Sequence, residues 1–333
     1  MGGDRENDVK AIQCKAFGDI GDLVVEDVAA PELGAGQVRV AVRAASVNFF
    51  DLLLVQGLYQ VKPPLPFIPG SDAAGEVIEL GPGVTGVKTG ERVVPMATGG
   101  TFAEQLVAPA DTLLAIPDGV DFAQAAAYRG TYGTALYALE KRARLAAGEF
   151  LLVNGAAGGT GLAAVELGRL IGARVIGAVG SDEKFDIVRQ TGAEAVINYE
   201  TESLRDRVKE LTGGTGADVI FDAVGGDIFD QSLRCIAWGG RLLVIGFTSG
   251  RIPSAPANLA LLKGCSIVGV FYGSWMEREP EAGRELNQRL LGWIAEGRVR
   301  PHISMTFPLE RTIEAMNALA TRKAVGKVVI TMD

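Results

Sequence analysis

Residues 150–179 constrain the fold of this chain more than any other segment. A short apolar run, Phe150 to Val153, is followed by Gly155, Gly158 and Gly161, which form a G-x-x-G-x-x-G frame. Apolar residues with helical spacing come next, and a second apolar run covers 174–179. The two runs are separated by the distance expected of a β-α-β unit. The segment therefore predicts a strand, a tight glycine turn, a helix and a second strand.

This arrangement is typical of a dinucleotide site. Glycines at such a turn let the backbone approach a pyrophosphate, and the helix N-terminus offers unpaired N–H groups to it. The commoner G-x-G-x-x-G frame would put Ala156 at its first glycine position, so the frame here is a variant. A glycine cluster by itself can be an ordinary turn, but the flanking strand and helix favour the dinucleotide interpretation. The expected phosphate-binding residues are Gly155, Gly158, Gly159, Thr160 and Gly161.

The end of the second strand bears on the choice of cofactor. An NAD site usually has an acid there, about 20 residues past the glycines, bonded to the ribose 2′-hydroxyl. Here Gly180 is followed by Ser181, and no acid stands at the strand tip itself. Ser181 can donate a hydrogen bond and Lys184 can supply positive charge, which suits a 2′-phosphate, and Tyr199 could reach the same place. We therefore expect NADPH rather than NADH.

Two alternatives remain open at this strand end. Ser181 could cap a helix, with Lys184 a solvated charge on its first turn. Asp182 is close enough to contact a ribose instead of leaving room for a phosphate.

Composition limits the partners. The chain has 333 residues, a net charge of −8 and no basic cluster, which argues against nucleic acid. No apolar run is long enough to span a bilayer, and the polar N-terminus lacks the apolar core of a signal peptide. Cys14, Cys235 and Cys265 are scattered and odd in number, so we expect free thiols in a reducing compartment and a cytoplasmic protein.

Two regimes are visible along the chain. Residues 9–125 are rich in strand signals, such as the period-two alternation of Val38 to Arg43, and are punctuated by Gly and Pro. From about residue 130 strands alternate with helices, which predicts a doubly wound parallel sheet. The expected strands are 150–154, 174–179, 195–198, 218–222, 241–246 and 266–271. A helix is expected over 279–296, and a last strand, Lys327 to Thr331, should return to the first region.

Several motifs together identify a family resemblance. They are Val47–Asp51, Gly57–Tyr59, Leu65–Gly70, Ala74–Val77, Gly81–Val84, Gly90–Val93, the glycine turn, Ala195–Tyr199, Asp222–Gly225 and Gly326–Val329. Across nearly its whole length the chain resembles the medium-chain dehydrogenase/reductase superfamily, in its zinc-free NADPH:quinone oxidoreductase (zeta-crystallin-like) branch. The resemblance implies an α/β protein with a GroES-like β-barrel-type domain, 1–129 and 274–333, and a Rossmann domain, 130–273. It also implies a cofactor cleft between the domains, and a homodimer or homotetramer.

The same resemblance implies roles for individual residues. Asn48 should contact the nicotinamide-side ribose, and Thr134 the nicotinamide region. Gly246, Phe247 and Phe271 should line the same end. Ser181, Lys184 and Tyr199 match NADPH-selecting positions, and Arg322 should approach the 2′-phosphate. Simpler interpretations are that Asn48 is a turn residue, Thr134 a helix-start cap and Phe271 a core aromatic residue.

Metal chemistry can be judged by counting ligands. Catalytic zinc requires a set of Cys, His and acidic ligands, and this chain has a single histidine, His302. Where the zinc-containing branch has Gly-His-Glu, this chain has Gly70, Ser71 and Asp72, and no CxxC pair is present. We therefore expect no zinc. Tyr137 and Lys141 match the Tyr-x-x-x-Lys pair of short-chain dehydrogenases, but they precede the glycine turn and are expected to be a packed tyrosine and a solvated lysine.

The expected function is zinc-independent, NADPH-dependent reduction of a small-molecule quinone in the expected cleft between the domains, by transfer of a hydride or of single electrons from the nicotinamide. Tyr59 and Tyr132 are candidates for orienting the substrate. No residue stands out as an obligatory acid, so solvent could supply the proton. The alternative within the family is reduction of an enone or enoyl-thioester, an activated alkene. A thioester carrier would need basic residues at the cleft, for which Arg43, Lys62, Arg129 and Arg278 are the candidates. The alternative from another class is a non-catalytic NADPH-binding protein.

Overall fold

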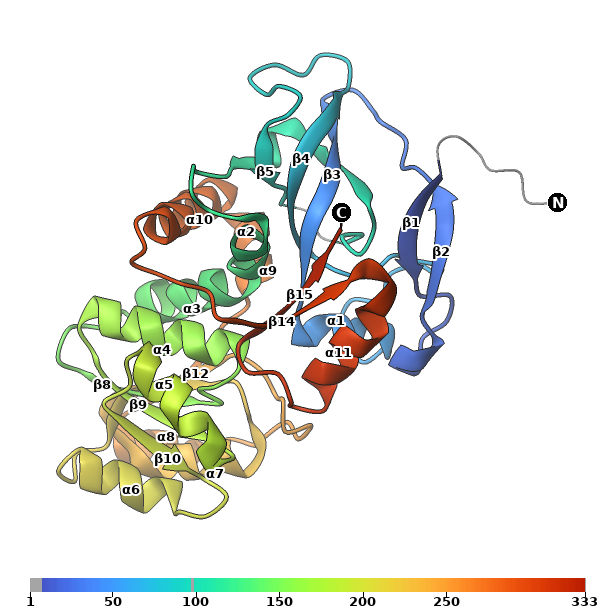
Figure 1. The fold of residues 1–333 in the computed structure, drawn as a ribbon. Helices are drawn as coiled ribbons and strands as arrows, with labels where there is room; N and C mark the ends of the chain where they lie inside the picture. Colours follow the sequence, from blue (N-terminus) through green and yellow to red (C-terminus); the bar gives the residue numbers. More distant parts are fainter. Residues whose placement is uncertain (1–7, 97–98, 333) are drawn as a thin grey trace. The chain divides into compact units, whose positions relative to one another are not determined.

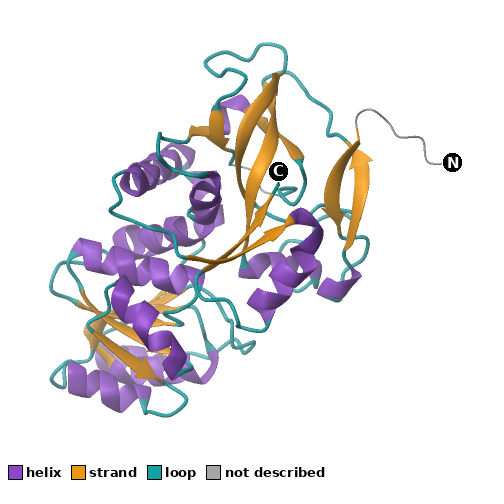
Figure 2. Ribbon diagram, in the orientation of Figure 1, coloured by secondary structure: helices purple, strands orange, loops and turns teal. Residues whose placement is uncertain are grey.

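The computed structural model describes residues 8–96 and 99–332 of the chain. In its second half, six parallel strands form one sheet with the spatial order β10-β9-β8-β11-β12-β13 (Figures 1 and 2). These strands are β8 (Phe150–Asn154), β9 (Arg174–Val179), β10 (Ala195–Asn198), β11 (Ala217–Asp222), β12 (Ile236–Val244) and β13 (Ser266–Gly269). Counted from β8, this is the 3-2-1-4-5-6 order of a doubly wound Rossmann sheet. The predicted sheet is confirmed, although β12 begins earlier than expected.

Helices pack on both faces of this sheet (Figure 2). Helix α4 contacts α3 and α5 on one face, and α7 contacts α6 and α8 on the other. Strand β8 is almost entirely apolar and is buried along four of its five residues, as expected of a parallel strand covered on both sides. The helices are α3 (Thr134–Leu136), α4 (Gly159–Ile171), α5 (Phe185–Thr191), α6 (Leu204–Leu211), α7 (Gly226–Cys235), α8 (Ala257–Lys263), α9 (Tyr272–Arg278) and α10 (Pro280–Ala295).

The first part of the chain forms a mostly antiparallel sheet. Strand β3 is its centre and pairs with β4, β6 and β15, and alternate residues of β3 are buried, as the period-two pattern predicts. The strands are β1 (Asp8–Gln13), β2 (Val24–Ala29), β3 (Gln37–Val47), β4 (Asp72–Leu80), β5 (Arg92–Val94), β6 (Gln105–Pro109), β7 (Leu114–Ala115), β14 (Ile303–Pro308) and β15 (Lys327–Thr331). Because β15 pairs with β3, the predicted return of the C-terminal strand is confirmed. The helices here are α1 (Phe49–Val55), α2 (Phe122–Ala127) and α11 (Thr312–Ala320).

The chain divides into two compact units, each with its own apolar core. Unit 1 comprises Met1–Gly130 and Leu291–Asp333, and unit 2 comprises Thr131–Leu290. The units change at 130 and at 290, whereas the expected domain limits lie at 129 and 273, and the expected domain division stays a prediction. Side chains of α9 and α10 explain the difference, because they bind the start of unit 2. Trp275 stacks on Tyr137 with ring centroids 4.5 Å apart, and Arg289 donates to Glu140 at 2.5 Å.

Two further sequence expectations concern packing and membranes. Tyr137 is buried and Lys141 is exposed, in agreement with the interpretation of this pair as a packed tyrosine and a surface lysine. Among residues 8–96 and 99–332, no helix combines the length and hydropathy that crossing a bilayer requires.

Candidate cofactor and active site

The glycine turn of unit 2 lies at the carboxyl end of β8, beside β11, where the strand order of the sheet reverses. Ligands of doubly wound sheets bind at this switch point. Gly155 follows β8 with a left-handed backbone, φ 71°, and Gly158 is the N-cap of α4. A hydrogen bond from Gly158 N to Gly155 O, 3.0 Å long, closes the turn. The first N–H groups of α4 have no partners within the helix and can therefore bind an anion.

Gly161 is fixed by packing. A Cβ atom at this position would lie 2.1 Å from the carbonyl oxygen of Gly155, which is backbone and cannot rotate away. Gly158, in contrast, would have ordinary contact at 3.4 Å, and its φ of −76° is open to any residue. Gly155 thus serves the turn and Gly161 the close packing of α4, as a dinucleotide turn requires, whereas the contacts within the described residues would also allow a side chain at Gly158. The turn fits the phosphates of a dinucleotide.

Asn154 and Asp222 form a buried hydrogen-bonded pair next to the glycine turn. Asn154, at the end of β8, donates through Nδ2 to Asp222 Oδ1 at 3.0 Å and to Ser232 Oγ at 2.9 Å. Asp222, at the end of β11, also accepts from the backbone N–H groups of Val224 and Gly225. Burial raises the pKa of Asp222, and the hydrogen bonds from Asn154 and the backbone oppose that rise. This pair joins the ends of the two central strands.

The tip of β9 carries the residues expected to select NADPH. Ser181 is extended (φ −159°) and precedes a 3₁₀ turn, Asp182–Lys184, as its N-cap. Ser181 thus stands at the cap position, as the alternative interpretation expected, but its side chain makes no capping hydrogen bond. Its hydroxyl can therefore still bind a ligand. Within the described residues the ammonium group of Lys184 has no hydrogen bond or ion pair. The ring of Tyr199 lies against Gly180, because a Cβ added at Gly180 would be 3.2 Å from it.

Asp182, the first residue of this 3₁₀ turn, has a hydrogen-bond partner on β10. Asn198 Nδ2 donates to Asp182 Oδ1 at 2.7 Å. Asn198 is buried at the end of β10, and Asp182 is exposed. The carboxylate that could have contacted a ribose is therefore bonded to the neighbouring strand.

The segment 245–251 is held firmly beside the end of β11. The backbone N–H groups of Gly246, Thr248 and Ser249 donate to carbonyl oxygens of the Asp222–Val224 segment. Arg251 closes this loop by donating to Asp227 at 2.8 Å and Asp230 at 2.6 Å, both on α7. Gly246 and Phe247, which are expected near the nicotinamide, are thus part of a hydrogen-bonded loop at the same edge of the sheet as the glycine turn.

The remaining predicted residues of unit 2 have different surroundings. Thr134 is the first residue of α3 and half-buried, and Phe271 precedes α9 with 56% of its surface exposed. Phe271 is therefore not a core aromatic residue. Tyr132 is buried, and its hydroxyl donates to Glu166 Oε2 at 2.7 Å. Burial and the neighbouring Glu166 carboxylate raise the pKa of Tyr132 well above its usual value.

Unit 1 holds a buried polar cluster around Asn48, which we call the Asn48 cluster. It consists of Asn48, Asp51, Asp72, Arg129 and Lys327. Asn48 Oδ1 accepts from Lys327 Nζ at 2.7 Å, and Asn48 Nδ2 donates to Asp72 Oδ2 at 2.9 Å. Because an ammonium can only donate and a carboxylate only accept, the orientation of the amide is fixed at both ends. Asn48 is the N-cap of α1, but these contacts make it more than a turn residue.

Charges within the Asn48 cluster partly compensate one another. Arg129 Nε donates to Asp72 Oδ1 at 2.8 Å, and Asp51 Oδ2 accepts from the backbone N–H of Asn48 at 2.8 Å. Burial lowers the pKa of Lys327 to about 8, against the attraction of Asp72 and Asp51. Burial raises the pKa of Asp51 to about 7, against the hydrogen bond from Asn48. Perturbed titrating groups of this kind gather at functional sites.

Tyr59 belongs to the neighbourhood of this cluster. Its ring packs on Phe50 with centroids 5.7 Å apart, and it lies in the loop after α1. Burial raises the pKa of its hydroxyl, and the Asp51 carboxylate raises it further. The phenol therefore keeps its proton at neutral pH and can donate a hydrogen bond.

Arg322 and metal ligands complete the set of sequence predictions. Arg322 lies in unit 1, in the turn after α11, with a left-handed backbone of φ 58°. Its approach to a 2′-phosphate stays a prediction. Across residues 8–96 and 99–332, no three side chains of His, Cys, Asp or Glu gather closely enough to hold a metal ion. Asp72 accepts from N–H groups of Arg129, Asn48 and Gly130, which is not the surrounding of a metal ligand.

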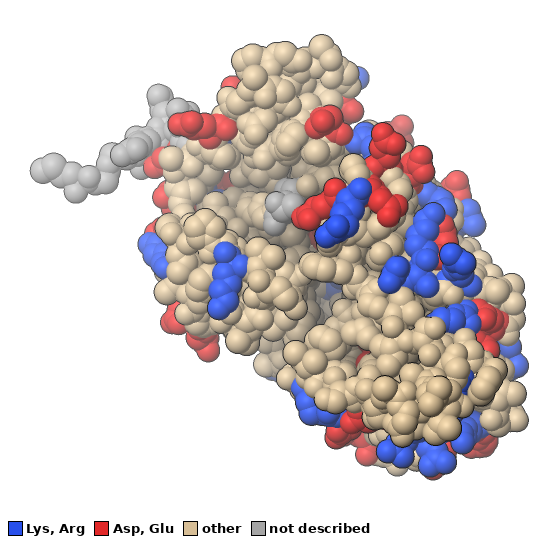
Figure 3. All heavy atoms as spheres, turned by 180° about the vertical axis from the view of Figure 1, so that it is seen from behind, with Lys and Arg blue, Asp and Glu red and all other residues tan. Residues whose placement is uncertain are grey.

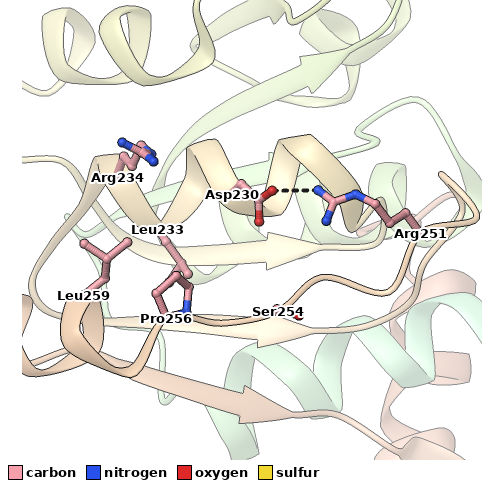
Figure 4. A pocket seen from close by; sticks show the side chains of 7 residues that line it. All are labelled: Asp230, Leu233, Arg234, Arg251, Ser254, Pro256 and Leu259. Atoms are coloured by element: carbon pink, nitrogen blue, oxygen red, sulfur yellow. Dashed lines mark hydrogen bonds and ion pairs between the residues drawn. The ribbon is translucent and has the colours of Figure 1, made fainter.

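A surface hollow of about 270 Å³ in unit 2 lies apart from these residues. It is formed by α7, α8 and the end of the loop closed by Arg251 (Figure 4). Its lining is Asp230, Leu233, Arg234, Arg251, Ser254, Pro256 and Leu259. None of the residues expected to bind cofactor or substrate lines it, so the hollow is not part of the candidate site.

Sequence reasoning missed Asp51 and Lys327 as site residues, and treated Arg129 and Asp72 only as parts of other arguments. Both Asp51 and Lys327 stand inside the motifs that carry the family resemblance, Val47–Asp51 and Gly326–Val329. The sequence did contain a signal for Lys327, because this lysine begins an apolar strand that is expected to be buried. A buried charge usually has a partner, so the position of Lys327 indicated a buried polar contact. Its partners lie some 280 positions away in sequence and could not be identified without the fold.

Comparison with known families matches both units. Residues 34–118 match the family described as alcohol dehydrogenase GroES-like domain, and residues 159–288 match the family described as zinc-binding dehydrogenase. These ranges lie in unit 1 and unit 2, respectively.

Individual relatives cover nearly the whole chain. A quinone oxidoreductase-like protein 2 homolog of Nematostella vectensis is 46% identical over 325 residues, 96% of this chain and 88% of the relative. A quinone oxidoreductase of Pseudomonas aeruginosa is 37% identical over 324 residues, 96% of this chain and 99% of the relative. The solved structure of Escherichia coli quinone oxidoreductase complexed with NADPH has a TM-score of 0.90 at 29% identity, covering 97% of this chain and all of that one.

Proposed function

This chain belongs to the medium-chain dehydrogenase/reductase superfamily, and on that premise we propose that it is an NADPH-dependent reductase of quinones that works without zinc. The observation that carries the proposal is the glycine turn at the switch point of the Rossmann sheet, with Ser181 and Lys184 at the tip of β9. The turn suits a dinucleotide, and a hydroxyl and an ammonium at the strand tip suit a 2′-phosphate rather than a bare ribose.

The relatives support the choice of acceptor. Both curated relatives described above carry the name quinone oxidoreductase or quinone oxidoreductase-like. The loop that contains Tyr59 also exposes apolar side chains, with Leu58 70%, Val61 62% and Leu65 41% exposed. Apolar surface beside one phenol suits a flat, weakly polar acceptor such as a quinone better than a charged one.

In the proposed reaction, nicotinamide supplies the hydride when it is bound, and the residues of this chain position the cofactor and the acceptor and polarise the acceptor oxygen. The α4 N-terminus and the glycine turn bind the phosphates, and Ser181, Lys184 and Tyr199 bind the adenine-side ribose phosphate. Thr134, Gly246, Phe247 and Phe271 line the nicotinamide end. Asn48 accepts from a ribose hydroxyl through Oδ1, which Lys327 holds in place.

Of the two tyrosines, Tyr59 is the better donor to a substrate oxygen. The Tyr132 proton is engaged by Glu166 at 2.7 Å, so this phenol would have to break a charge-assisted bond in order to donate elsewhere. Tyr59 is half-buried and keeps its proton. We assign the orientation of the acceptor oxygen to Tyr59, and solvent then supplies the proton that completes reduction.

An enoyl-thioester is a weaker candidate for the acceptor, because the cations expected to bind its phosphates are engaged. Arg43 pairs with Glu76 at 2.9 Å and Arg129 with Asp72 at 2.8 Å. Lys62 lies over the ring of Phe17, and Arg278 donates to Ser274. Figure 3 shows acidic and basic side chains mixed on the face it presents, which suits neither a polyphosphate carrier nor nucleic acid. A simple enone remains the second acceptor class.

A homodimer or homotetramer is part of the proposal. Strand β13 is an edge of the sheet, and its residues are mostly exposed. Beside it Trp238, Leu261 and Leu262 are 80%, 79% and 68% exposed. An unpaired edge with large exposed apolar residues is a surface that proteins usually cover. The free thiols support a cytoplasmic location.

The test is steady-state oxidation of NADPH and of NADH with phenanthrenequinone, para-benzoquinone and an alkenal as acceptors. We expect quinone turnover with a preference for NADPH. Turnover of the alkenal alone would replace quinone by an activated alkene. Tight NADPH binding with no turnover of any acceptor would favour the non-catalytic binding protein.

A further inference from the structure

Just past the tip of β9, the 3₁₀ turn Asp182–Lys184 contains an acid whose carboxylate is bonded to another strand. Asp182 stands 21 positions after Gly161, close to the place where NAD sites have the acid that bonds the ribose 2′-hydroxyl. Such an acid also repels a 2′-phosphate. A site for NADPH that retains Asp182 must therefore keep its carboxylate away from the phosphate.

Asn198 holds the Asp182 carboxylate in this way, through a hydrogen bond from its side-chain amide. Its Nδ2 donates to Asp182 Oδ1 at 2.7 Å, and its own Oδ1 accepts from the backbone N–H of Glu200 at 3.0 Å. The second contact fixes which end of the amide faces Asp182, because a backbone N–H can only donate. Asn198 is itself 5% exposed at the end of β10, so the position of its amide is determined by the sheet.

The same strand end provides the surface that the phosphate would use instead. Tyr199 N donates to Val179 O at 3.0 Å, and the Tyr199 ring covers Gly180. With Asp182 bonded toward β10, the groups left at the tip of β9 are the hydroxyl of Ser181 and the ammonium of Lys184. The other acids of this region are the exposed Glu183, Asp186 and Glu200 and the half-buried Glu202. Glu202 accepts from the backbone N–H of Asn198 at 3.1 Å and pairs with Arg207 at 2.9 Å, so it is bonded on the side of β10.

We propose that Asn198 is a specificity-determining residue, which selects NADPH by holding the Asp182 carboxylate away from the 2′-phosphate. It acts through Asp182 and is therefore a positioning residue. The inference rests on the proposed use of NADPH and adds the residue that makes the preference possible in the presence of an acid.

The test measures dissociation constants for NADPH and NADH by fluorescence titration, which needs no acceptor. Wild-type protein is compared with N198A, N198D, D182A, the double variant D182A/N198A and the exchanged pair D182N/N198D. N198D keeps the size of the side chain and the acceptor for Glu200 but replaces the donor that faces Asp182 with a second carboxylate. Melting temperatures show that each variant is folded, and N198A serves where N198D is not.

We expect N198A and N198D to weaken NADPH binding about tenfold or more, because one freed carboxylate then faces the phosphate, and to leave NADH binding unchanged or tighter. D182A/N198A should bind NADPH as D182A does, since the charge is gone. D182N/N198D should recover most of the NADPH affinity, because the amide and carboxylate have exchanged places and can bond again.

Two results would overturn the inference alone. One is a wild-type NADPH preference that survives N198A and N198D. The other is an equal loss caused by N198A with and without Asp182, which would mean that Asn198 supports only the strand end. A wild-type protein that binds NADH more tightly than NADPH would instead overturn the proposed cofactor, and this inference with it.

Discussion

The glycine turn of unit 2 and the Asn48 cluster of unit 1 are built in opposite ways. The turn is made of backbone from one short segment, 154–161, and its side chains are mostly small or absent. The cluster is made of charged and amide side chains brought together from α1 and its N-cap, from β4, from the π-helical turn Arg129–Gly133 after α2, and from β15. The turn depends on the absence of side chains at its glycines, whereas the cluster depends on buried side chains of opposite charge.

This difference predicts how each site fails. Where backbone approach matters, an added carbon atom clashes with atoms that cannot move. Where buried charges compensate one another, removal of one partner leaves the others unpaired in a low dielectric. Local substitutions should therefore abolish binding at the turn, and should mainly destabilise and loosen the cluster.

The largest effect is expected from Gly161→Val. The new Cβ would meet Gly155 O at 2.1 Å, which must push α4 away from the turn. We expect loss of NADPH binding by roughly 100-fold or more, and about 1–3 kcal/mol of destabilisation. Isothermal titration and thermal melting provide the measurements. Gly292→Ala, at an open helical position with no atom within 4 Å of the new Cβ, is the control and should bind normally.

The second effect concerns charge at the strand tip. Lys184→Glu should raise KM for NADPH about 10- to 100-fold, because the substitution removes a hydrogen bond to the charged 2′-phosphate. It should change KM for NADH little, since NADH has no phosphate there. Lys141→Glu, at a lysine that is exposed in the same unit, is the matched control. Equal losses for both cofactors would mean that Lys184 does not bind the 2′-phosphate.

Lys327→Met tests the cluster of unit 1. It removes the ammonium that fixes Asn48 Oδ1 and leaves Asp51 and Asp72 without a nearby ammonium. We expect destabilisation of about 3 kcal/mol and a rise in KM for NADPH of roughly tenfold as Asn48 loses its fixed orientation. Thermal melts and initial rates are the measurements, with exposed Lys323→Met as control. A stability loss without any change in KM would separate the cluster from cofactor binding.

How much of each region the sequence predicted follows from the same contrast. The glycine turn, its two strands and α4 were predicted nearly to the residue, because turn, strand and helix signals are all local. The cofactor contact of Asn48 was inferred from a family motif and stays a prediction. Its bonding partners were not predicted, since Lys327 meets it only through the pairing of β15 with β3. The bond between Asn198 and Asp182 was missed for the same reason, as neighbouring parallel strands bring together residues from different β-α units.

A smaller effect is expected from pH. The pKa of Asp51 is raised by burial from 3.8 to about 7, so between these values the folded protein retains a proton that the unfolded chain has lost. The folded state then binds more protons, and its stability should fall as pH rises from about 4 to 7. Asp51→Asn removes this contribution. The difference between wild-type and Asp51→Asn melting temperatures should therefore change across this window, and parallel curves would contradict the raised pKa.

The smallest effect is expected from metal removal, and the reason again lies in how unit 1 is built. Asp72 follows Ser71, at the place where zinc-containing relatives would have Gly-His-Glu, and its carboxylate already accepts from Arg129, Asn48 and Gly130. The guanidinium at 2.8 Å puts a positive charge where a metal ion would need negative ligands. Incubation with a strong chelator should leave the rate of NADPH oxidation unchanged. A rate that falls on chelation and returns with added zinc would show that the cluster around Asn48 can give up its internal bonds for a metal, and would overturn the zinc-free mechanism.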